Sequence, residues 1–210
     1  MSILNKSTYL FFDLDGTILN SEISIRTSLE HSIKKNCPEY LDKINLMKIG
    51  PKVPNLLEGH IPSNKIKQVT DDFREYFDNE GFSLTILFPD VVETLLSLKK
   101  KFTMNTLTNK PRNISIKILN MLKIDELFNN FYSTYEDNIS KGDLIKKLIK
   151  CRGYYCFVGD TEEDYNAAMQ NNIDFIYCEY GYGINNLKNT TSINYFSDLI
   201  DVLNLNQLDE

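Results

Sequence analysis

The segment YLFFDLDGTILN, residues 9–20, runs from an apolar stretch straight into two acids, Asp13 and Asp15. Its opening residues are apolar without alternation, which is typical of a strand that is covered on both faces in a parallel sheet. An extended backbone would point the two carboxylates the same way, because a single residue separates them. Gly16 then permits a sharp turn that most residues would resist. The segment therefore predicts a buried strand that ends in a pair of carboxylates.

Similar short apolar runs recur later in the chain, separated by segments with helical periodicity. The expected strands cover residues 102–107, 131–135, 154–158 and 174–178, with a weaker candidate at 193–196. The expected helices cover residues 90–100, 111–122, 140–150 and 161–170. In the first of these helices, Asp90 and Glu93 have the spacing of a capping box. Alternating strands and helices predict an α/β fold with a doubly wound, Rossmann-like parallel sheet.

Residues 20–85 interrupt this alternation, because they contain no good strand. Ile25, Leu29 and Ile33 follow each other at a spacing of four, and a second apolar series over residues 66–77 has spacings of three and four. Between the two series, IGPKVP (49–54) is expected to be an irregular loop. We therefore expect a small helical domain of residues 20–85, inserted into an α/β core domain of residues 1–19 and 86–210.

The composition is that of a globular protein that does not bind nucleic acid. Of the 210 residues, 42% are hydrophobic, and the net charge is −6 at pH 7, so cations for an anionic substrate must be gathered locally. No apolar run is long enough to cross a bilayer, and the first residues lack the pattern of a signal peptide. We expect a cytoplasmic protein without membrane contact; monomer and dimer both remain open.

The cysteine and histidine content argues against a zinc site. The relevant residues are Cys37, Cys151, Cys156, Cys178, His31 and His60. No two cysteines have CxxC spacing, and a disulfide framework is not expected in a chain of this length with an ordinary core.

A second acidic cluster follows another expected strand. VGDTEEDYNAA (158–168) places Asp160 and Asp164 just beyond it. Ligands of an open parallel sheet bind outside the carboxyl ends of the strands, so these acids are expected near Asp13 and Asp15. Such carboxylates repel each other, and hard oxygen ligands of this kind suit Mg²⁺. The spacing of Thr161 and Asp164 is equally that of a helix cap.

Residues that could bind an anion lie after two other strands. In LTNKP (107–111), Thr108 offers a hydroxyl and Asn109 a backbone N–H close to a helix start. Asn and Thr are also common in ordinary strand-to-helix turns. Lys141 opens the next helix, where the macrodipole disfavours a cation. This placement predicts a compensating carboxylate or phosphate beside Lys141, although a lone lysine could also be solvated.

Together, these motifs resemble those of the haloacid dehalogenase superfamily of phosphohydrolases, and within it the phosphoglycolate phosphatase-like branch. DLDGT (13–17) is similar to the family's first motif, TNK (108–110) to its second, Lys141 to its third and GDTEED (159–164) to its fourth. The helical insert is similar to the family's cap domain, and EYGYG (179–183) to its stretch after the fifth strand. Asn20-Ser21 and Gly142 depart from the usual Asp-Ser and Pro, which weakens any transfer of substrate identity.

The resemblance implies a Mg²⁺-dependent phosphatase that acts on a small phosphorylated metabolite, phosphoglycolate phosphatase-like. Asp13 would be the nucleophile that forms an aspartyl-phosphate, and Asp15 the acid and base. Mg²⁺ would be bound by Asp13, the backbone carbonyl of Asp15 and Asp160, with Asp164 orienting these ligands. The residues that would hold the phosphoryl group are Thr108, the amide of Asn109, and Lys141.

Substrate selection in this branch implicates the helical cap. The candidates are Gly50 and Lys52 in the IGPKVP loop and Arg26 on the first cap helix. Lys52 could meet a second anionic group of the substrate. Both Lys52 and Arg26 could equally be solvated surface residues.

Other functions use the same scaffold. A sugar phosphomutase usually carries a histidine early in the first cap helix, where this chain has Ile25 and Arg26, with His31 a turn or more late. A pyrophosphatase remains an alternative, whereas a dehalogenase has no need for Asp15 or the second acidic cluster. A phosphoacceptor signalling domain would lack the helical insert and the acid at Asp15. A catalytically silent module would not keep every catalytic position filled.

Overall fold

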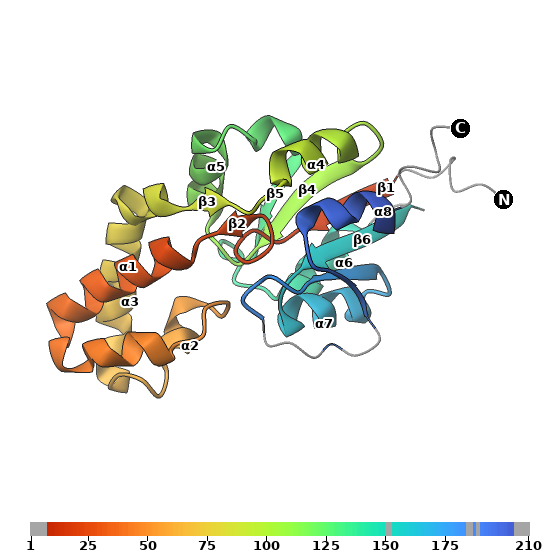
Figure 1. Cartoon of the computed structure of the whole chain (residues 1–210). Coiled ribbons are helices and arrows are strands. Elements are labelled where there is room, and N and C mark those ends of the chain that lie inside the picture. Colours follow the sequence, from red (N-terminus) through yellow and green to blue (C-terminus); the bar gives the residue numbers. More distant parts are fainter. Residues whose placement is uncertain (1–7, 150–152, 184–186, 188–189, 204–210) are drawn as a thin grey trace. The chain divides into compact units, whose positions relative to one another are not determined.

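The computed structural model describes residues 8–149, 153–183, 187 and 190–203. The chain divides into two compact units, drawn in Figure 1. The first, here called the α/β unit, comprises Met1–Leu19 and Leu87–Glu210, and the second, the helical unit, comprises Asn20–Ile86.

The α/β unit contains a six-stranded sheet in the order β5-β4-β1-β6-β7-β8. The strands are β1 (Thr8–Phe12), β4 (Thr103–Thr108), β5 (Asn130–Ser133), β6 (Tyr154–Gly159), β7 (Asp174–Cys178) and β8 (Thr191–Ile193). Every neighbouring pair is parallel. The predicted α/β fold is confirmed, and the weak strand candidate at 193–196 lies slightly earlier, in β8.

Strand β1 lies inside the sheet and sets the position of the loops that follow it. Phe12 pairs with Thr106 of β4 on one side and with Val158 of β6 on the other. Because the strands are parallel, the segments after β1, β4 and β6 leave the sheet at the same edge. Residues that are far apart in sequence are therefore brought together there.

Helices connect the strands and cover the sheet (Figure 1). They are α4 (Val91–Leu98), α5 (Arg112–Met121), α6 (Lys141–Leu148), α7 (Glu162–Gln170) and α8 (Leu199–Val202), with 3₁₀ turns at η4 (Asp125–Leu127) and η5 (Phe196–Asp198). The predicted capping box of Asp90 and Glu93 is wrong. Asp90 has a left-handed φ of 62° and makes no side-chain cap bond, since capping needs an extended backbone.

The unbroken apolar runs of the strands are explained by burial on both faces. On one face, Phe11 and Phe157 pack in a buried cluster with residues of α6 and α7, including Ile145 and Ala168. Phe12 points the opposite way and meets the rings of residues 128 and 196 at centroid distances of 6.2 and 6.1 Å. Burying each such ring stabilises the fold by about 1.5–3 kcal/mol.

The helical unit is built on two long helices. Its elements are α1 (Glu22–Asn36), η2 (Pro38–Leu46), α2 (Val53–Leu57), α3 (Ser63–Asn79) and η3 (Gly81–Leu84). The apolar residues that predicted the two helices, such as Leu29, Val69 and Phe77, are buried. The expected loop over 49–54 is shorter than predicted, because α2 already begins at Val53.

Two short strands mark the passages between the units. They are β2 (Leu19–Asn20) and β3 (Ile86–Leu87), which pair in a separate two-stranded sheet. The sequence did not predict them, because two residues carry no recognisable alternation.

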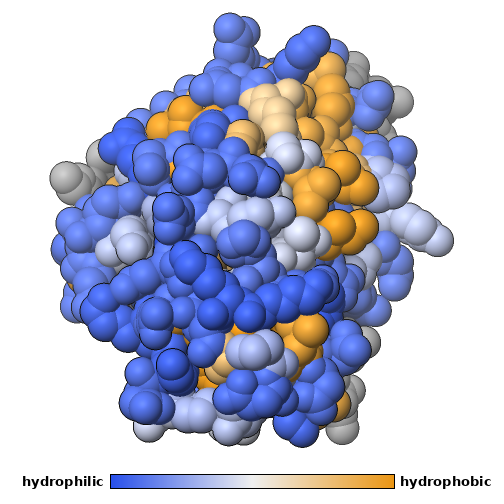
Figure 2. All heavy atoms as spheres, turned by 90° about the vertical axis from the view of Figure 1, so that its left-hand side faces the viewer, coloured by the Kyte–Doolittle hydropathy of each residue, from blue (hydrophilic) through white to orange (hydrophobic). Residues whose placement is uncertain are grey.

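The face seen in Figure 2 is mainly hydrophilic, with separate hydrophobic patches. Within the described residues, no helix combines the length and the apolar character that a membrane span requires.

Candidate active site

Acidic side chains gather at the carboxyl ends of β1 and β6. Asp13 continues directly from β1, and its N–H donates to the carbonyl of Val158 at 2.9 Å. Asp160 follows β6 in the same way. One carboxylate oxygen from each of Asp13, Asp160 and Asp164 lies within 4.8 Å of the others. The sheet thus brings three of the predicted site residues into one cluster.

The turn after β1 packs closely against this cluster. The amides of Thr17, Ile18 and Leu19 all donate to the carbonyl of Leu14. Gly16 has a φ of 85°, and a Cβ atom there would overlap with the carboxylate of Asp160. The conformation and the close approach both require glycine at this position.

Burial makes the negative charges of the cluster unfavourable. Burial raises the pKa of Asp13 to about 7; Lys141 opposes this shift, and Asp164 and Asp15 add to it. The pKa of Asp160 is also raised well above its usual value by burial and then by Asp164 and Asp13. A cation bound among these groups would remove this cost.

The donor atoms fit a divalent cation. The Oδ1 atoms of Asp13 and Asp15 are buried and have no hydrogen-bond partner among the described residues. Buried polar atoms are rarely left unpaired, so the Asp13 oxygen, which belongs to the acidic cluster, is suited to a bound cation, and the Asp15 oxygen is open to a substrate group. An all-oxygen set of this kind matches the preference of Mg²⁺.

Lys141 lies at the start of α6 and is almost completely buried. Its Nζ is 3.1 Å from Asp13 Oδ2 and 2.6 Å from Asp164 Oδ1, and it lies 5.9 Å from the ring centre of Phe157. Burial alone would lower the pKa of this lysine, but Asp13 and Asp164 raise it above its usual value. The carboxylate partner expected from its place in the first helical turn is present, and the side chain stays charged.

Asp164 serves two purposes at once. Thr161 and Asp164 form a complete capping box at the start of α7. Asp164 Oδ2 accepts from the amide and the hydroxyl of Thr161 at 3.0 and 2.6 Å, while Oδ1 accepts from Lys141. The cap interpretation is therefore confirmed, and the cap holds the same carboxylate that binds Lys141.

The segment after β4 contributes three successive residues. The buried hydroxyl of Thr108 accepts from the amide of Lys110 at 3.2 Å. The side chain of Asn109 bridges Thr134 and Glu163, with distances of 2.6 and 2.9 Å. This bridge fixes the backbone whose amide was predicted to bind phosphate.

Lys110 is a site residue that the sequence analysis missed. Its Nζ lies 3.1 Å from Asp15 Oδ2, and only 6% of its side chain is exposed. A signal was available, because Lys110 is the last residue of the TNK motif and lies just before α5.

The loop after β7 was also missed as part of the site. The amide of Tyr182 donates to Asp160 Oδ2 at 2.7 Å, and the hydroxyl of Tyr180 donates to the carbonyl of Thr17 at 2.8 Å. A Cβ atom at Gly181 or Gly183 would overlap with Asp160. The loop EYGYG thus orients Asp160, mainly through its backbone.

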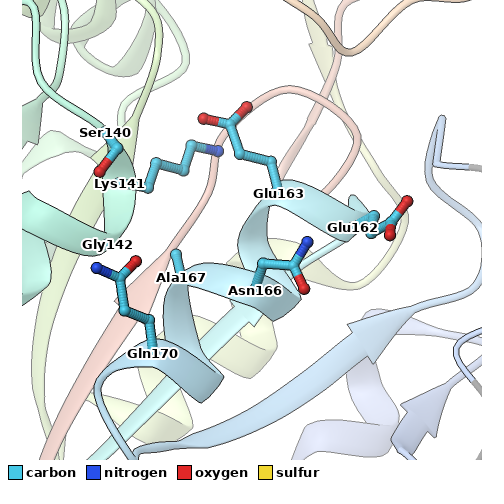
Figure 3. A pocket seen from close by; sticks show the side chains of 8 residues that line it. All are labelled: Ser140, Lys141, Gly142, Glu162, Glu163, Asn166, Ala167 and Gln170. Carbon is cyan, nitrogen blue, oxygen red and sulfur yellow. The ribbon is translucent and has the colours of Figure 1, made fainter.

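A pocket of about 500 Å³ opens between α6 and α7 beside Lys141 (Figure 3). It is lined by Ser140, Lys141, Gly142, Glu162, Glu163, Asn166, Ala167 and Gln170. A Cβ atom at Gly142 would overlap with Gln170. The side chain of Gln170 therefore occupies the space that a larger residue at position 142, such as the family's usual proline, would need.

The predicted specificity residues lie in the helical unit. Gly50 and Lys52 lie in the loop before α2. Arg26 is 2.8 Å from Glu22 and donates to the carbonyl of Ile44 at 3.0 Å. His31 stacks on Tyr76, with ring centres 4.1 Å apart. The groups of Arg26 and His31 are thus already engaged within this unit.

Comparisons with known proteins identify the family of this chain and several similar proteins. Residues 10–178 match the model of a family described as haloacid dehalogenase-like hydrolase. A phosphoglycolate phosphatase of Haemophilus influenzae is 28% identical over 193 residues, which cover 83% of this chain and 86% of that protein. The pyrophosphatase PpaX of Bacillus cereus is 27% identical over 121 residues, 57% of this chain and 56% of that protein. The crystal structure of a predicted phosphatase from Clostridium acetobutylicum is 26% identical with a TM-score of 0.80, covering 98% of this chain and 100% of that one.

Proposed function

The chain belongs to the haloacid dehalogenase-like hydrolase family, and from this membership we propose that it is a Mg²⁺-dependent phosphatase. Its substrate would be a small phosphate monoester, hydrolysed through an aspartyl-phosphate. The observation that carries the proposal is the buried Asp13, which has Lys141 at one oxygen and an unpaired second oxygen. A carboxylate held in this way is suited to in-line attack on phosphorus.

Asp13 is the nucleophile in this proposal. One of its oxygens attacks the phosphorus atom, and the bond between phosphorus and the ester oxygen breaks. Water then attacks the aspartyl-phosphate, which returns free Asp13 and releases inorganic phosphate. Thr108, the amide of Asn109, and Lys141 bind the phosphoryl oxygens during both steps.

Asp15 moves the proton. It donates a proton to the departing ester oxygen in the first step and accepts one from the attacking water in the second. Lys110, 3.1 Å away, holds its Oδ2. The unpaired Oδ1 of Asp15 leaves one oxygen for this task.

The metal would be held by the side chains of Asp13 and Asp160 and the carbonyl of Asp15. Asp164 would orient the site through Lys141, and the amide of Tyr182 through Asp160. When bound, Mg²⁺ supplies positive charge that offsets the phosphoryl oxygens and the buried acids.

For the substrate, we propose a phosphoglycolate-like compound, because several similar proteins are phosphoglycolate phosphatases. Hydrolysis of pyrophosphate is the second candidate, because PpaX is named a pyrophosphatase. Of the predicted specificity residues, Gly50, Lys52 and Arg26, we would test Lys52 first, since Arg26 is held by Glu22 and Ile44.

The decisive experiment is phosphate release from a panel of phosphorylated metabolites with Mg²⁺. Asp13→Asn should abolish turnover while leaving the fold intact. Asp71→Asn is a matched control, since Asp71 forms an exposed ion pair with Lys67. Normal hydrolysis of p-nitrophenyl phosphate by the Asp13→Asn variant would contradict the assignment of the nucleophile.

A further inference from the structure

In the proposed chemistry, Lys110 does no more than hold Asp15. We infer that it selects substrates whose leaving group carries a negative charge close to the scissile oxygen. Such substrates are phosphorylated hydroxy acids and phosphoanhydrides, as opposed to phosphate esters of neutral alcohols. The inference rests on the proposed function, because it concerns the leaving-group side of the same site.

The first step of the argument is the position of the ammonium group. Lys110 Nζ is 3.1 Å from Asp15 Oδ2, and the side chains are 6% and 21% exposed. Asp15 is the group that would touch the leaving oxygen. Only the carboxylate of Asp15 would therefore separate the positive charge of Lys110 from the leaving oxygen. Because Lys110 is buried, water screens this charge little.

The second step is the division of labour between two lysines. Lys141 lies against Asp13 and Asp164, so its charge serves the nucleophile and the phosphoryl group. Lys110 lies against Asp15 instead. Each of the two buried lysines thus contacts a different one of the two acids. Lys141 contacts Asp13 on the phosphoryl side, and Lys110 contacts Asp15 on the leaving-group side.

The third step is the charge of the surroundings. The described side chains at the site include three buried acids and Asp15, which is 21% exposed, and the whole chain has a net charge of −6. A leaving group with its own negative charge would be repelled unless a cation met it. An ammonium group has three donors, so Lys110 can keep Asp15 and bind a second anionic oxygen.

The fourth step is the chemistry shared by two relatives. One is named for phosphoglycolate and the other for pyrophosphate. In the first, the leaving group is a hydroxy acid whose carboxylate is one carbon away from the scissile oxygen. In the second, the leaving group is phosphate itself. Both leaving groups carry the charge that Lys110 would recognise.

A purely structural role of Lys110 makes a different prediction. If the lysine only positioned Asp15, its loss would slow all substrates with equally basic leaving groups by the same factor. Phosphoglycolate and its neutral amide, phosphoglycolamide, form a suitable pair because they differ in the charge beside the leaving oxygen. Their ratio of kcat/KM therefore separates selection from positioning.

The experiment measures kcat/KM for this pair with Mg²⁺ in the wild type and in the variants Lys110→Gln, Lys110→Arg and Lys146→Gln. The wild type should prefer phosphoglycolate. Lys110→Gln should lower this preference about 10- to 100-fold, the range for loss of a charge-assisted hydrogen bond. Lys110→Arg should retain part of the preference. Lys146→Gln, an exposed site on α6 that removes one positive charge from the chain, should leave both values unchanged.

The remaining outcomes are distinguishable. Equal loss on both substrates in Lys110→Gln would overturn selection and leave a positioning role. A wild type that does not prefer phosphoglycolate, or that hydrolyses only p-nitrophenyl phosphate, would overturn this inference and the proposed phosphoglycolate-like substrate, but not the proposed phosphatase activity. A wild type that releases phosphate from neither phosphoglycolate, phosphoglycolamide nor p-nitrophenyl phosphate would overturn the proposed function as well. Thermal unfolding of each variant shows whether it is folded.

Discussion

Asp13 and Asp15 are only two residues apart, yet their surroundings differ. Asp13 is almost fully buried beside Lys141, whereas the side chain of Asp15 is 21% exposed beside Lys110. Asp15→Asn should lower kcat/KM by about 10²- to 10⁴-fold for substrates with basic leaving groups, because these need a proton most. The loss should be smaller for p-nitrophenyl phosphate. A series of alkyl and aryl phosphates measures how the loss in kcat/KM depends on the pKa of the leaving group. Equal losses across the series would argue against the acid role.

The raised pKa of Asp13 makes the stability of the metal-free protein depend on pH. Burial raises the pKa of Asp13 to about 7 in the folded state, above the ordinary value of 3.8 for an aspartic acid. The folded state therefore binds more protons than the unfolded state in this interval. The contribution of Asp13 to stability is fully present below pH about 4 and is lost as the pH rises through about 7.

Asp13→Asn should remove this dependence. In EDTA, the wild type should lose roughly 5 °C more in Tm between pH 5 and pH 8 than the variant does. Thermal unfolding at both pH values measures the difference, with Asp71→Asn as a control that keeps the buried cluster. Identical pH profiles for wild type and Asp13→Asn would show that Asp13 is not held in a destabilised charged state.

Most of the charged side chains of the candidate site could be predicted from the sequence. Asp13 and Asp160 stood out because they follow apolar runs, and Asp164 because it lies in the same acidic cluster as Asp160. Tyr182 could not be recognised, because it acts on Asp160 through its backbone amide. Lys110 was overlooked although it ends the TNK motif, because the motif does not indicate that its side chain reaches Asp15 at the end of a neighbouring strand.

At the scale of an element, the turn after β1 depends on Gly16. Gly16→Ala introduces strain at a φ of 85° and a Cβ atom that overlaps with Asp160. We expect kcat/KM to fall about 100-fold, because a misplaced ligand disrupts the site. Gly59→Ala is the matched control, since Gly59 has a φ of 74° but an added Cβ would meet nothing within 4 Å.

Both glycine variants should lose about 1 kcal/mol of stability from backbone strain, measured by urea unfolding. Only Gly16→Ala should also lose activity. An active Gly16→Ala enzyme would show that Asp160 can shift without consequence and that the close packing of this turn is not needed.

The long elements were predicted well, and the short or tertiary features were not. The strands of the α/β unit could be predicted because unbroken apolar runs indicate burial on both faces of a sheet. The helices could be predicted from their helical periodicity. The cap at Asp90 failed because its backbone is left-handed and its carboxylate lies near Ser197 instead, at 3.4 Å. That contact joins residues that are 107 positions apart, so no local pattern could indicate it.

At the scale of the whole molecule, the described site residues all belong to the α/β unit. Asp15 and Thr108 are separated in sequence by the entire helical unit, Asn20–Ile86. The parallel pairing of β1 with β4 nevertheless brings their ends together. A ligand that binds at the ends of these strands should therefore change the thermal stability of the protein.

Mg²⁺ should stabilise the folded protein, because binding offsets the mutual repulsion of Asp13, Asp160 and Asp164. A ligand at 100 times its Kd adds about 2.7 kcal/mol, enough to raise Tm by several degrees. Asp160→Asn should respond much less to Mg²⁺. It should also start from a higher midpoint without metal, since burial raises the pKa of Asp160 and its charge is unfavourable.

The measurement is thermal unfolding in EDTA and in increasing MgCl₂, with KCl added to keep the ionic strength constant. Asp71→Asn is the control for the loss of an acid outside the cluster and should respond like the wild type. An equal gain in Tm for wild type and Asp160→Asn would place the ion elsewhere. No gain in the wild type would mean that the buried acids are neutralised by protons and by Lys141 alone, and the role assigned to the metal would then be wrong.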